Sequence, residues 1–146
     1  MKVEIRLVPR PEDEEAVIRT VELTDNIRQC AELLENGAGK LIGYKEQAAY
    51  RLDIQSLYYL EVVDNRTFAY TKSDCFRIEQ KLYELEGTLD ARFFRCSKSM
   101  IVNVRKIAHV RPGDNSRILA ALKNGEEIVI SRSYVKDFKE RLGIRT

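Results

Sequence analysis

Cysteine is scarce in this sequence, which limits the covalent and metal frameworks that could stabilise the fold. The 146-residue chain has three cysteines, an odd number, which lie far apart and form no CxxC pair. This pattern argues against a disulfide framework and against a structural zinc site. We therefore expect Cys30, Cys75 and Cys96 to be reduced and mostly buried thiols.

Arrangements typical of catalysis are also missing. The single histidine, His109, has apolar neighbours and no carboxylate close by to orient it, so we expect a structural role. The patterns HExxH, GxSxG, GxGxxG and GxxxxGKS/T do not occur. Glu126 and Glu127 are adjacent in an expected strand, so their side chains would point to opposite faces. We expect no enzymatic activity, no small-molecule substrate, no cofactor and no metal ion.

Long apolar stretches are absent as well. Wholly apolar runs are short, such as residues 128–130, and cannot form a transmembrane helix. The N-terminal MKVEIRLVPR lacks the apolar block of a signal peptide. We therefore expect a cytoplasmic protein.

Charge is distributed unevenly along the chain. Residues 1–91 contain 12 Lys and Arg against 18 Asp and Glu, a net charge of −6. Residues 92–146 contain 13 against 5, a net charge of +8, which brings the chain to its formal +2. A basic segment of this kind is expected of a surface that binds a polyanion. Two ends that attract each other, or ordinary solvated faces, would give the same pattern, so charge alone leaves these alternatives open.

The N-terminal part carries two local patterns. Val3, Ile5 and Leu7 alternate with charged residues, which predicts a half-buried strand ended by the following prolines. From Glu12, an acidic first turn precedes apolar positions spaced three and four apart, with a stop at Asn36-Gly37. This spacing predicts an amphipathic helix of roughly six turns. Its stripe is typical of a core or a dimer seam and comprises Val17, Val21, Thr24, Ile27, Ala31 and Leu34.

From Lys40 onward the pattern becomes that of strands, with alternating aromatic and β-branched residues. Asp64-Asn65 predicts a hairpin tip. Asn124-Gly125 predicts a two-residue hairpin in which both turn positions need positive φ. Most of the chain after residue 40 is therefore expected to be antiparallel β structure.

Two short helices are expected within this β-rich part. One covers QKLYELE and closes at Gly87, and the other is capped by Ser131 or Ser133 and ends at Gly143. The expected fold is mainly β with peripheral short helices, preceded by the N-terminal strand and amphipathic helix. We expect a division into an N-terminal strand-helix extension (residues 1–40) and a main domain (residues 41–146).

Three polar and basic clusters occur where turns or element ends are expected. Each combines a cation with small polar residues, which suits a DNA duplex: hydroxyls hold phosphates and a long cationic side chain reaches a base edge. Any one cluster alone could be an ordinary exposed turn. Three together, two of them in the basic half, favour a DNA-binding surface. Its candidate residues are Asn65, Arg66, Thr67, Arg95, Ser97, Lys98, Ser99, Arg132, Ser133 and Lys136.

The clusters lie in a longer pattern that resembles the LytTR family of bacterial DNA-binding domains. The resemblance is carried by FFRCSKSMIVNVRKIAHV and RILAALKNGEEIVISRSYVKDFKERLG, and upstream by DIQSLYYLEVVDNRTFAYT. It covers about residues 45–145, and its SMIVN and SRSY elements at this spacing are quite specific. It implies a LytTR-like β-sheet fold over residues 41–146, in which loops insert side chains into successive major grooves of double-stranded DNA.

The resemblance also assigns roles to individual residues. The base-reading groups fall on the 65–67 turn, Lys98 and Arg132, and the positions near the phosphate backbone are Ser97, Ser99, Ser133 and Lys136. Asn103 matches the asparagine of the family motif and is expected to bond a turn backbone. Many members have histidine where this chain has Cys96-Ser97-Lys98, so base preference at that position does not carry over. One strand and one helix stand where the family's usual phosphate-receiving domain would be, so we expect no phospho-regulation within this chain.

Three further hypotheses remain open at this stage. The N-terminal helix could pack on the β domain or form a homodimer seam. The protein could instead be a non-catalytic interaction module whose basic half binds an acidic protein partner, including a membrane protein that controls activity. RNA binding is a weaker hypothesis, since no RNP-like strand is present. Finally, Arg95 and Lys98 could lower the pKa of Cys96 and create a redox-sensitive thiolate, against a buried structural thiol.

Overall fold

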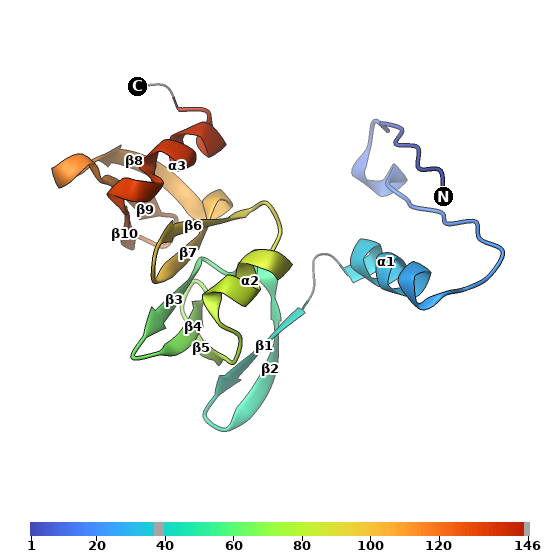
Figure 1. Ribbon diagram of the computed structural model, residues 1–146, viewed down its shortest axis with the longest axis horizontal. Coiled ribbons are helices and arrows are strands. Elements are labelled where there is room, and N and C mark those ends of the chain that lie inside the picture. The colour runs from blue at the N-terminus through green and yellow to red at the C-terminus, as the bar shows by residue number, and fades with distance from the viewer. Residues whose placement is uncertain (37–39, 145–146) are drawn as a thin grey trace. The chain divides into compact units, whose positions relative to one another are not determined.

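The computed structural model describes residues 1–36 and 40–144 and divides the chain into two compact units, Met1–Gly37 and Ala38–Thr146 (Figure 1). The first unit holds the 3-10 helix η1 (Pro11–Asp13) and helix α1 (Asp25–Asn36). The second carries strands β1 to β10 with helices α2 (Leu82–Thr88) and α3 (Val135–Leu142). None of the helices over these described ranges is long and apolar enough to cross a membrane.

Residues 3–7 do not form the expected strand. The strands of the described chain all lie between residues 40 and 130, and Val3, Ile5 and Leu7 are exposed. Alternation alone cannot form a strand, because the backbone N–H and C=O groups of a strand need a partner strand. The prediction was wrong because this alternating segment is paired with no other strand of the described chain.

The amphipathic helix is shorter than its apolar spacing indicated. α1 begins at Asp25, and the Thr24 Oγ1 accepts a hydrogen bond from the Ile27 backbone N–H at 3.3 Å. A threonine in this position caps a helix, because it satisfies a backbone donor that the first turn leaves unpaired. The preceding segment has β-branched residues at positions 17, 18, 20 and 21, which have low helix propensity. The expected stripe is therefore helical only from residue 25 onward.

The second unit contains two antiparallel sheets. The larger has the strand order β2-β1-β5-β4-β3-β7-β6 and the smaller has the order β10-β9-β8. These sheets with short peripheral helices confirm the mainly β fold expected from the sequence. The larger sheet comprises β1 (Lys40–Lys45), β2 (Ala48–Asp53), β3 (Tyr59–Val63), β4 (Arg66–Tyr70), β5 (Cys75–Ile78), β6 (Phe93–Ser97) and β7 (Met100–Asn103), and the smaller comprises β8 (Ile107–Pro112), β9 (Ile118–Leu122) and β10 (Glu127–Ile130).

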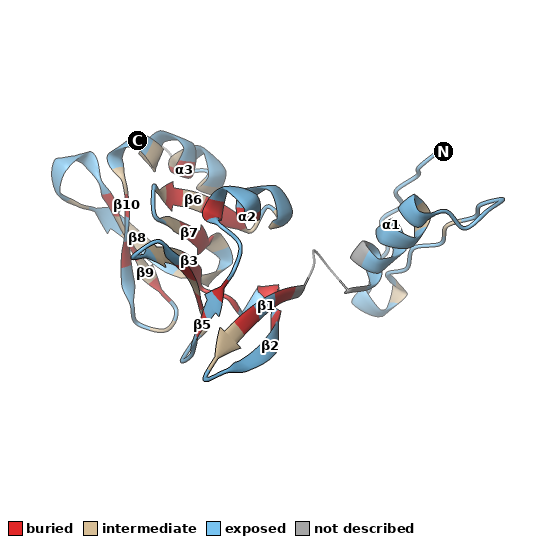
Figure 2. Cartoon of the chain, turned by 60° about the horizontal axis from the view of Figure 1, so that its bottom comes forward, coloured by how far each residue is buried: buried red, intermediate tan, exposed pale blue. Residues whose placement is uncertain are grey.

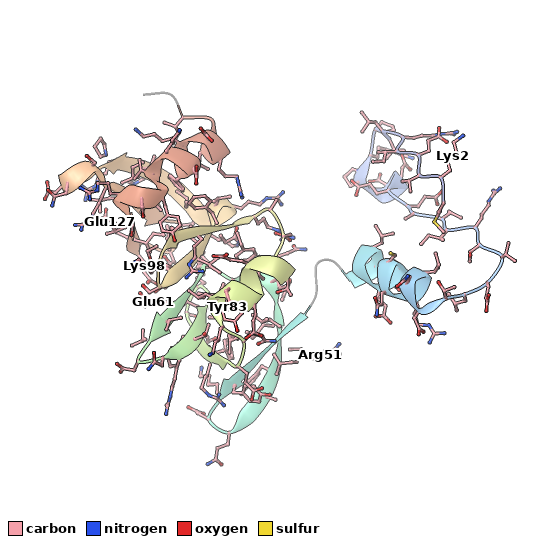
Figure 3. All side chains as sticks on the ribbon, in the orientation of Figure 1. Lys2, Arg51, Glu61, Tyr83, Lys98 and Glu127 are labelled. Atoms are coloured by element: carbon pink, nitrogen blue, oxygen red, sulfur yellow. The ribbon has the colours of Figure 1, made fainter. Side chains whose placement is uncertain are left out.

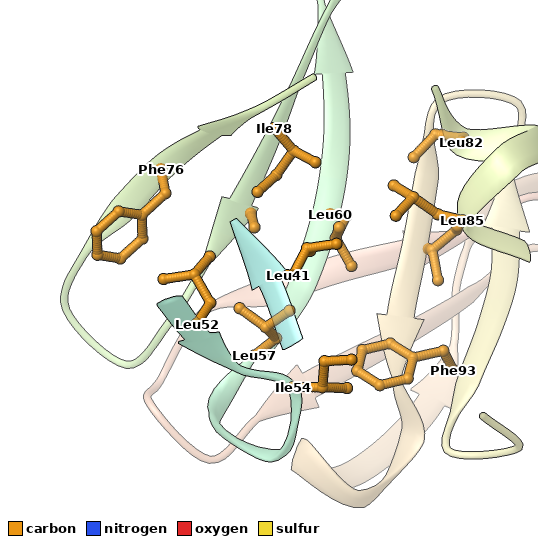
Figure 4. Packing of buried hydrophobic residues seen from close by; sticks show 12 residues of the cluster. Leu41, Leu52, Ile54, Leu57, Leu60, Phe76, Ile78, Leu82, Leu85 and Phe93 are labelled. Atoms are coloured by element: carbon orange, nitrogen blue, oxygen red, sulfur yellow. The ribbon is translucent and has the colours of Figure 1, made fainter. Parts of the chain in front are cut away.

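Adjacent residues of β6, the edge strand of the larger sheet, face two different cores. Phe93 belongs to a cluster that α2 covers through Leu82 and Leu85 (Figure 4). Phe94 belongs to a second cluster, which joins the larger sheet to the smaller sheet and to Phe138 of α3. Because neighbouring side chains of a strand point to opposite faces, the larger sheet lies between these two cores. Figure 2 shows buried segments on its strands β3, β6 and β7.

The hairpin at Asn124-Gly125 is confirmed, but its turn differs from the expected one. β9 and β10 are joined through residues 123–125, because the Leu122 N–H donates to the Glu126 carbonyl at 2.7 Å. Within this loop Gly125 adopts positive φ, at 93°, whereas Asn124 does not. A three-residue loop with glycine in the left-handed region therefore replaces the expected two-residue turn.

The helix ends were predicted only in part. α3 ends at Gly143 with φ of 70°, as expected. Its N-cap is Tyr134, the last residue of the 3-10 helix η5 (Arg132–Tyr134), and the Ser131 side chain makes no capping hydrogen bond. Gly87 lies inside α2, which continues to Thr88, so it does not close that helix. Neither Ser131 nor Ser133 is therefore used as the expected cap.

Candidate nucleic-acid interface

Turn 1, residues 64–66, connects β3 to β4. Asp64 and Asn65 have φ of 52° and 63°, and Val63 pairs with Arg66, as a tight two-residue turn requires. Asn and Asp tolerate this left-handed conformation better than other non-glycine residues. Asn65 and Arg66 are exposed, whereas Thr67 is 5% exposed within β4. The structure therefore presents two of the three predicted residues, and the third, Thr67, is directed into the core.

Turn 2, residues 97–99, connects β6 to β7. Ser97 pairs with Met100, so Lys98 and Ser99 form the tip, and a β-bulge lies just before it. The Ser97 Oγ accepts a hydrogen bond from the Ser99 backbone N–H at 3.2 Å. The Lys98 side chain is exposed at the end of this hairpin, where Figure 3 labels it. Ser97, Lys98 and Ser99 are thus brought together as expected.

Arg95 differs from the other predicted contact residues because its guanidinium is directed to the protein. Its Nε donates to the Ser97 carbonyl at 2.7 Å, and its Nη2 donates to the Lys98 carbonyl at 2.5 Å. Its Nη1 forms an ion pair with Glu86 of α2. Three of the guanidinium donors that were expected to face DNA therefore make contacts within the domain, and the direct DNA contact expected of Arg95 stays a prediction.

Turn 3, residues 131–134, leads from β10 into α3. Arg132 and Ser133 are exposed, and the Tyr134 N–H donates to the Ser131 carbonyl at 2.8 Å. Within the part of the chain that the structure describes, Arg132 has no ion-pair partner. Lys136 follows on α3 and is exposed as well. This turn therefore offers an unneutralised guanidinium to solvent.

The three turns, although distant in sequence, follow strand ends that backbone hydrogen bonds hold together. The Val62 N–H of β3 donates to the Ser99 carbonyl at 2.8 Å, which ties the end of β3 to turn 2. The Ser131 N–H donates to the Cys96 carbonyl at 2.9 Å, which ties the start of turn 3 to β6. We call the resulting set of residues, all exposed except the half-buried Ser97, the three-turn surface: Asn65, Arg66, Ser97, Lys98, Ser99, Arg132, Ser133 and Lys136.

One cation was missed by the sequence reasoning. Lys139 lines the same groove as Arg132, Lys136 and Ser116. Positions 132, 136 and 139 have the i, i+4, i+7 spacing of one helix face, which was the available signal. Arg132, Lys136 and Lys139 form a basic stripe that extends the three-turn surface along α3.

A partly buried hydrogen bond connects the larger sheet to the loop that leads into β10 of the smaller sheet. The Tyr59 hydroxyl donates to the Glu126 Oε2 at 2.7 Å. Burial, followed by this bond, raises the pKa of Tyr59, so the phenol stays protonated near neutral pH. Burial and the nearby Glu126 carboxylate also raise the pKa of Glu61.

Asn103 is confirmed in its expected structural role. Its Nδ2 donates to the Leu57 carbonyl at 2.8 Å, and its Oδ1 accepts from the Arg105 N–H at 3.1 Å.

The lone histidine is placed differently from what its apolar neighbours suggested. His109 is exposed on β8, opposite Ala121 of β9. No group of three or more His, Cys, Asp or Glu residues suited to a metal ion occurs over residues 1–36 and 40–144. The side chain thus has no buried structural role in β8.

Cys96 lies at the back of turn 2 and is fully buried, at 0% exposure. Burial raises the pKa of its thiol to about 12, although a backbone hydrogen bond and the nearby Arg95 both act to lower it. The hypothesis of an exposed thiolate is therefore wrong, because the side chain points into the core although its neighbours are cationic. Cys30 and Cys75 are exposed, so the expectation that most of the thiols are buried is also wrong.

We expect an alkylating reagent at about pH 8 to modify Cys30 and Cys75 in the native protein and to leave Cys96 unmodified. With its pKa raised to about 12, the Cys96 thiol is almost entirely protonated at this pH, and burial also blocks the reagent. The pKa of Cys75 is raised as well, but its side chain is exposed to the reagent. Mass spectrometry of tryptic peptides after timed labelling would measure this. The control is the same reaction in denaturant, where all three thiols should react, and equal labelling of Cys96 in the native protein would contradict the prediction.

Comparisons with known proteins identify the family of this chain. The family model described as the LytTr DNA-binding domain matches residues 47–143. A relative from Staphylococcus aureus strain NCTC 8325, named an HTH-type transcriptional regulator, is 30% identical over 129 residues, which cover 87% of this chain and 88% of the relative. Another, from the bovine strain RF122 and named in the same way, is 35% identical over 104 residues, or 71% of each chain.

A solved structure extends the likeness from sequence to fold. The LytTr DNA-binding domain of a Bacillus cereus protein superposes with a TM-score of 0.69 at 28% identity, covering 71% of this chain and 96% of that chain. The family match includes all three turns described above. The chain therefore belongs to the LytTr DNA-binding domain family.

Proposed function

We propose that this protein is a cytoplasmic, non-enzymatic transcription regulator that binds double-stranded DNA sequence-specifically through the three-turn surface. The observation that carries the proposal is that hydrogen bonds from Val62 of β3 to Ser99 of turn 2, and from Ser131 of turn 3 to Cys96 of β6, hold the strand ends that carry the three cation-bearing turns next to one another. Family membership and the names of the Staphylococcus aureus relatives support DNA binding and transcriptional regulation. Turns spaced along one surface suit insertion into successive major grooves at repeated promoter half-sites.

The roles of the side chains follow from their chemistry and exposure. Arg66, Lys98 and Arg132 each extend from a turn tip or element end, and we assign them to base edges, with Asn65 beside them. The phosphate contacts are assigned to Ser97, Ser99, Ser133, Lys136 and, from the structure, Lys139.

Turns are better placed for this task than helices in the described part of the chain. α1 and α2 are separated by β1 to β5, and α2 and α3 are separated by β6 to β10. A helix-turn-helix needs two helices joined by a short turn, with the second in the major groove. The proposed reading elements are therefore turns, although the relatives are named for the other motif.

The test is a gel shift on the DNA upstream of the protein's own coding sequence, with excess random DNA and RNA as competitors. We expect a retained complex whose log affinity falls with log salt by about 0.9 for each neutralised phosphate. A duplex of the same length with a scrambled sequence is the matched control and should bind more weakly. Equal binding to both duplexes, or none at moderate salt, would contradict the proposal and favour binding of an acidic protein partner, including a membrane protein.

We also propose that α1 mediates homodimerisation. Its apolar positions Ile27, Ala31 and Leu34 have helical spacing, and Leu34 is exposed within the N-terminal unit. Light scattering should give a mass that rises toward the dimer across micromolar concentrations, and L34E should abolish this rise. A strictly monomeric mass over that range would contradict the dimer and leave DNA binding unaffected.

A further inference from the structure

Turn 2 owes its shape to side chains that do not belong to its tip. Arg95 donates to two successive carbonyls, those of Ser97 and Lys98, at 2.7 and 2.5 Å. The Ser99 carbonyl is held by the Val62 N–H, and the Ser99 N–H is held by the Ser97 Oγ. The backbone of turn 2 is thus hydrogen-bonded to the rest of the domain, and the exposed Lys98 side chain is the cation that the turn presents to solvent.

The remaining contact of Arg95 is an acidic residue on a different element. Its Nη1 pairs with the Glu86 Oε1 at 2.5 Å, and the side chains of Arg95 and Glu86 are 24% and 44% exposed. Glu86 lies on α2, which is anchored in the core by the buried Leu82 and Leu85. The guanidinium is planar and its N–H donors have fixed directions. When Glu86 holds Nη1, the directions of Nε and Nη2 toward the turn 2 carbonyls are therefore fixed as well.

We propose that Glu86, acting through Arg95, positions turn 2 and so determines how specifically Lys98 reads DNA. The proposal rests on the function proposed above and adds an acidic, remote residue to it. Glu86 is a positioning residue: α2 holds the carboxylate, the carboxylate holds the guanidinium, and the guanidinium holds the carbonyls that flank Lys98. A side chain reads a base edge well only if it is held close to the productive geometry by its surroundings.

A positioning role and simple electrostatics predict different effects of E86Q on DNA affinity. A carboxylate near a DNA-binding surface repels phosphates, so charge alone predicts that E86Q binds all DNA more tightly. Positioning predicts that E86Q lowers the ratio of specific to random-sequence affinity, because Lys98 is then held less well. The ratio therefore separates the two effects, and the salt slope should stay unchanged because no phosphate contact is removed.

The experiment compares the full chain with E86Q, R95K and the matched control E79Q, which neutralises an exposed glutamate just before α2. Fluorescence anisotropy would measure affinity for the upstream duplex and for its scrambled counterpart. We expect E86Q to lower the affinity ratio about 3–5-fold, a modest loss because Glu86 is partly exposed. R95K should lower the ratio further, because an ammonium cannot make the forked contact, and E79Q should leave it unchanged.

A double-mutant cycle with K98A tests whether the effect passes through turn 2. In the K98A background, E86Q should cause no further loss in the ratio, since the side chain being positioned is gone. Hydrogen exchange of the turn 2 amides, measured without DNA, should be faster in E86Q and R95K than in the wild type and E79Q. Thermal unfolding midpoints equal to that of E79Q would show that the fold is retained.

The outcomes distinguish this inference from the proposed function. An unchanged ratio in E86Q, a loss that persists in K98A, or unchanged exchange in turn 2 would overturn the positioning role while specific binding by the wild type stands. A wild type that does not discriminate the two duplexes would overturn the proposed function and, with it, the specificity role of Glu86. The exchange measurement would then still decide whether Glu86 orders the turn.

Discussion

Replacing Arg132 with alanine is expected to weaken binding to the specific DNA site by about 1–3 kcal/mol and to change random-sequence affinity much less. In affinity this is a loss of roughly 5- to 150-fold. Arg132 is exposed at turn 3 and has no ion-pair partner among the residues that the structure describes, so its donors are available to a guanine O6 and N7. Fluorescence anisotropy with the upstream duplex and a scrambled duplex would measure both affinities.

The control for R132A should remove the same charge far from the three-turn surface. Lys72 suits this purpose because it is exposed in the connection between β4 and β5, at the end of β4 opposite to turn 1. K72A should leave the affinity for both duplexes nearly unchanged. Equal losses on the two duplexes in R132A would contradict base reading and make Arg132 a phosphate contact, in which case the salt slope should fall by about one.

The positions of the turns could be predicted from sequence because they depend on local chemistry. Asp64 and Asn65 form a tight turn since both tolerate positive φ, and Gly143 ends α3 for the same reason. Exposure of the turn residues could be predicted less well. Thr67 lies one residue beyond turn 1, where the pairing of β4 with β3 and β5 directs its side chain inward.

The role of Arg95 could not be predicted because its partner comes from another element. Sequence places Arg95 beside serines and a lysine and so indicates a DNA contact, whereas the structure brings Glu86 of α2 to it. The same reason explains Cys96, whose neighbours indicate an accessible thiolate but whose side chain faces the core across β6. Alternation within a strand is local, but which face is buried depends on the packing of both sheets.

In the N-terminal segment, by contrast, a clear alternating sequence pattern predicted a strand that does not form. Val3, Ile5 and Leu7 alternate as in a strand but pair with no other strand of the described chain. α1 begins at Asp25, just after Thr24, which accepts the Ile27 N–H, and this is thirteen residues after the acidic start at Glu12 that indicated a longer helix. Periodicity therefore indicated amphipathic character correctly and overestimated the length of the helix, because capping and propensity decide where a helix begins.

The second large effect concerns Phe138, which joins α3 to the larger sheet. It is 0% exposed, and its ring lies 5.6 Å from that of Phe94 in a tilted arrangement. F138A is expected to lower the free energy of unfolding of the domain by about 3–5 kcal/mol, since a buried aromatic is lost and a cavity remains. Urea denaturation followed by circular dichroism would measure the change in midpoint and slope.

Tyr83 on α2 provides the matched control, because it is an aromatic residue of a short helix but is 68% exposed (Figure 3). Y83A should change the free energy of unfolding by no more than about 0.5 kcal/mol. F138A should also weaken specific DNA binding under conditions where the domain remains folded, because α3 follows turn 3 directly and Phe138 holds it against β6. A stability change in F138A as small as that of Y83A would mean that α3 is not packed on the larger sheet as described. Turn 3, which carries Arg132, would then be held in place by the hydrogen bond from the Ser131 N–H to the Cys96 carbonyl and not by α3.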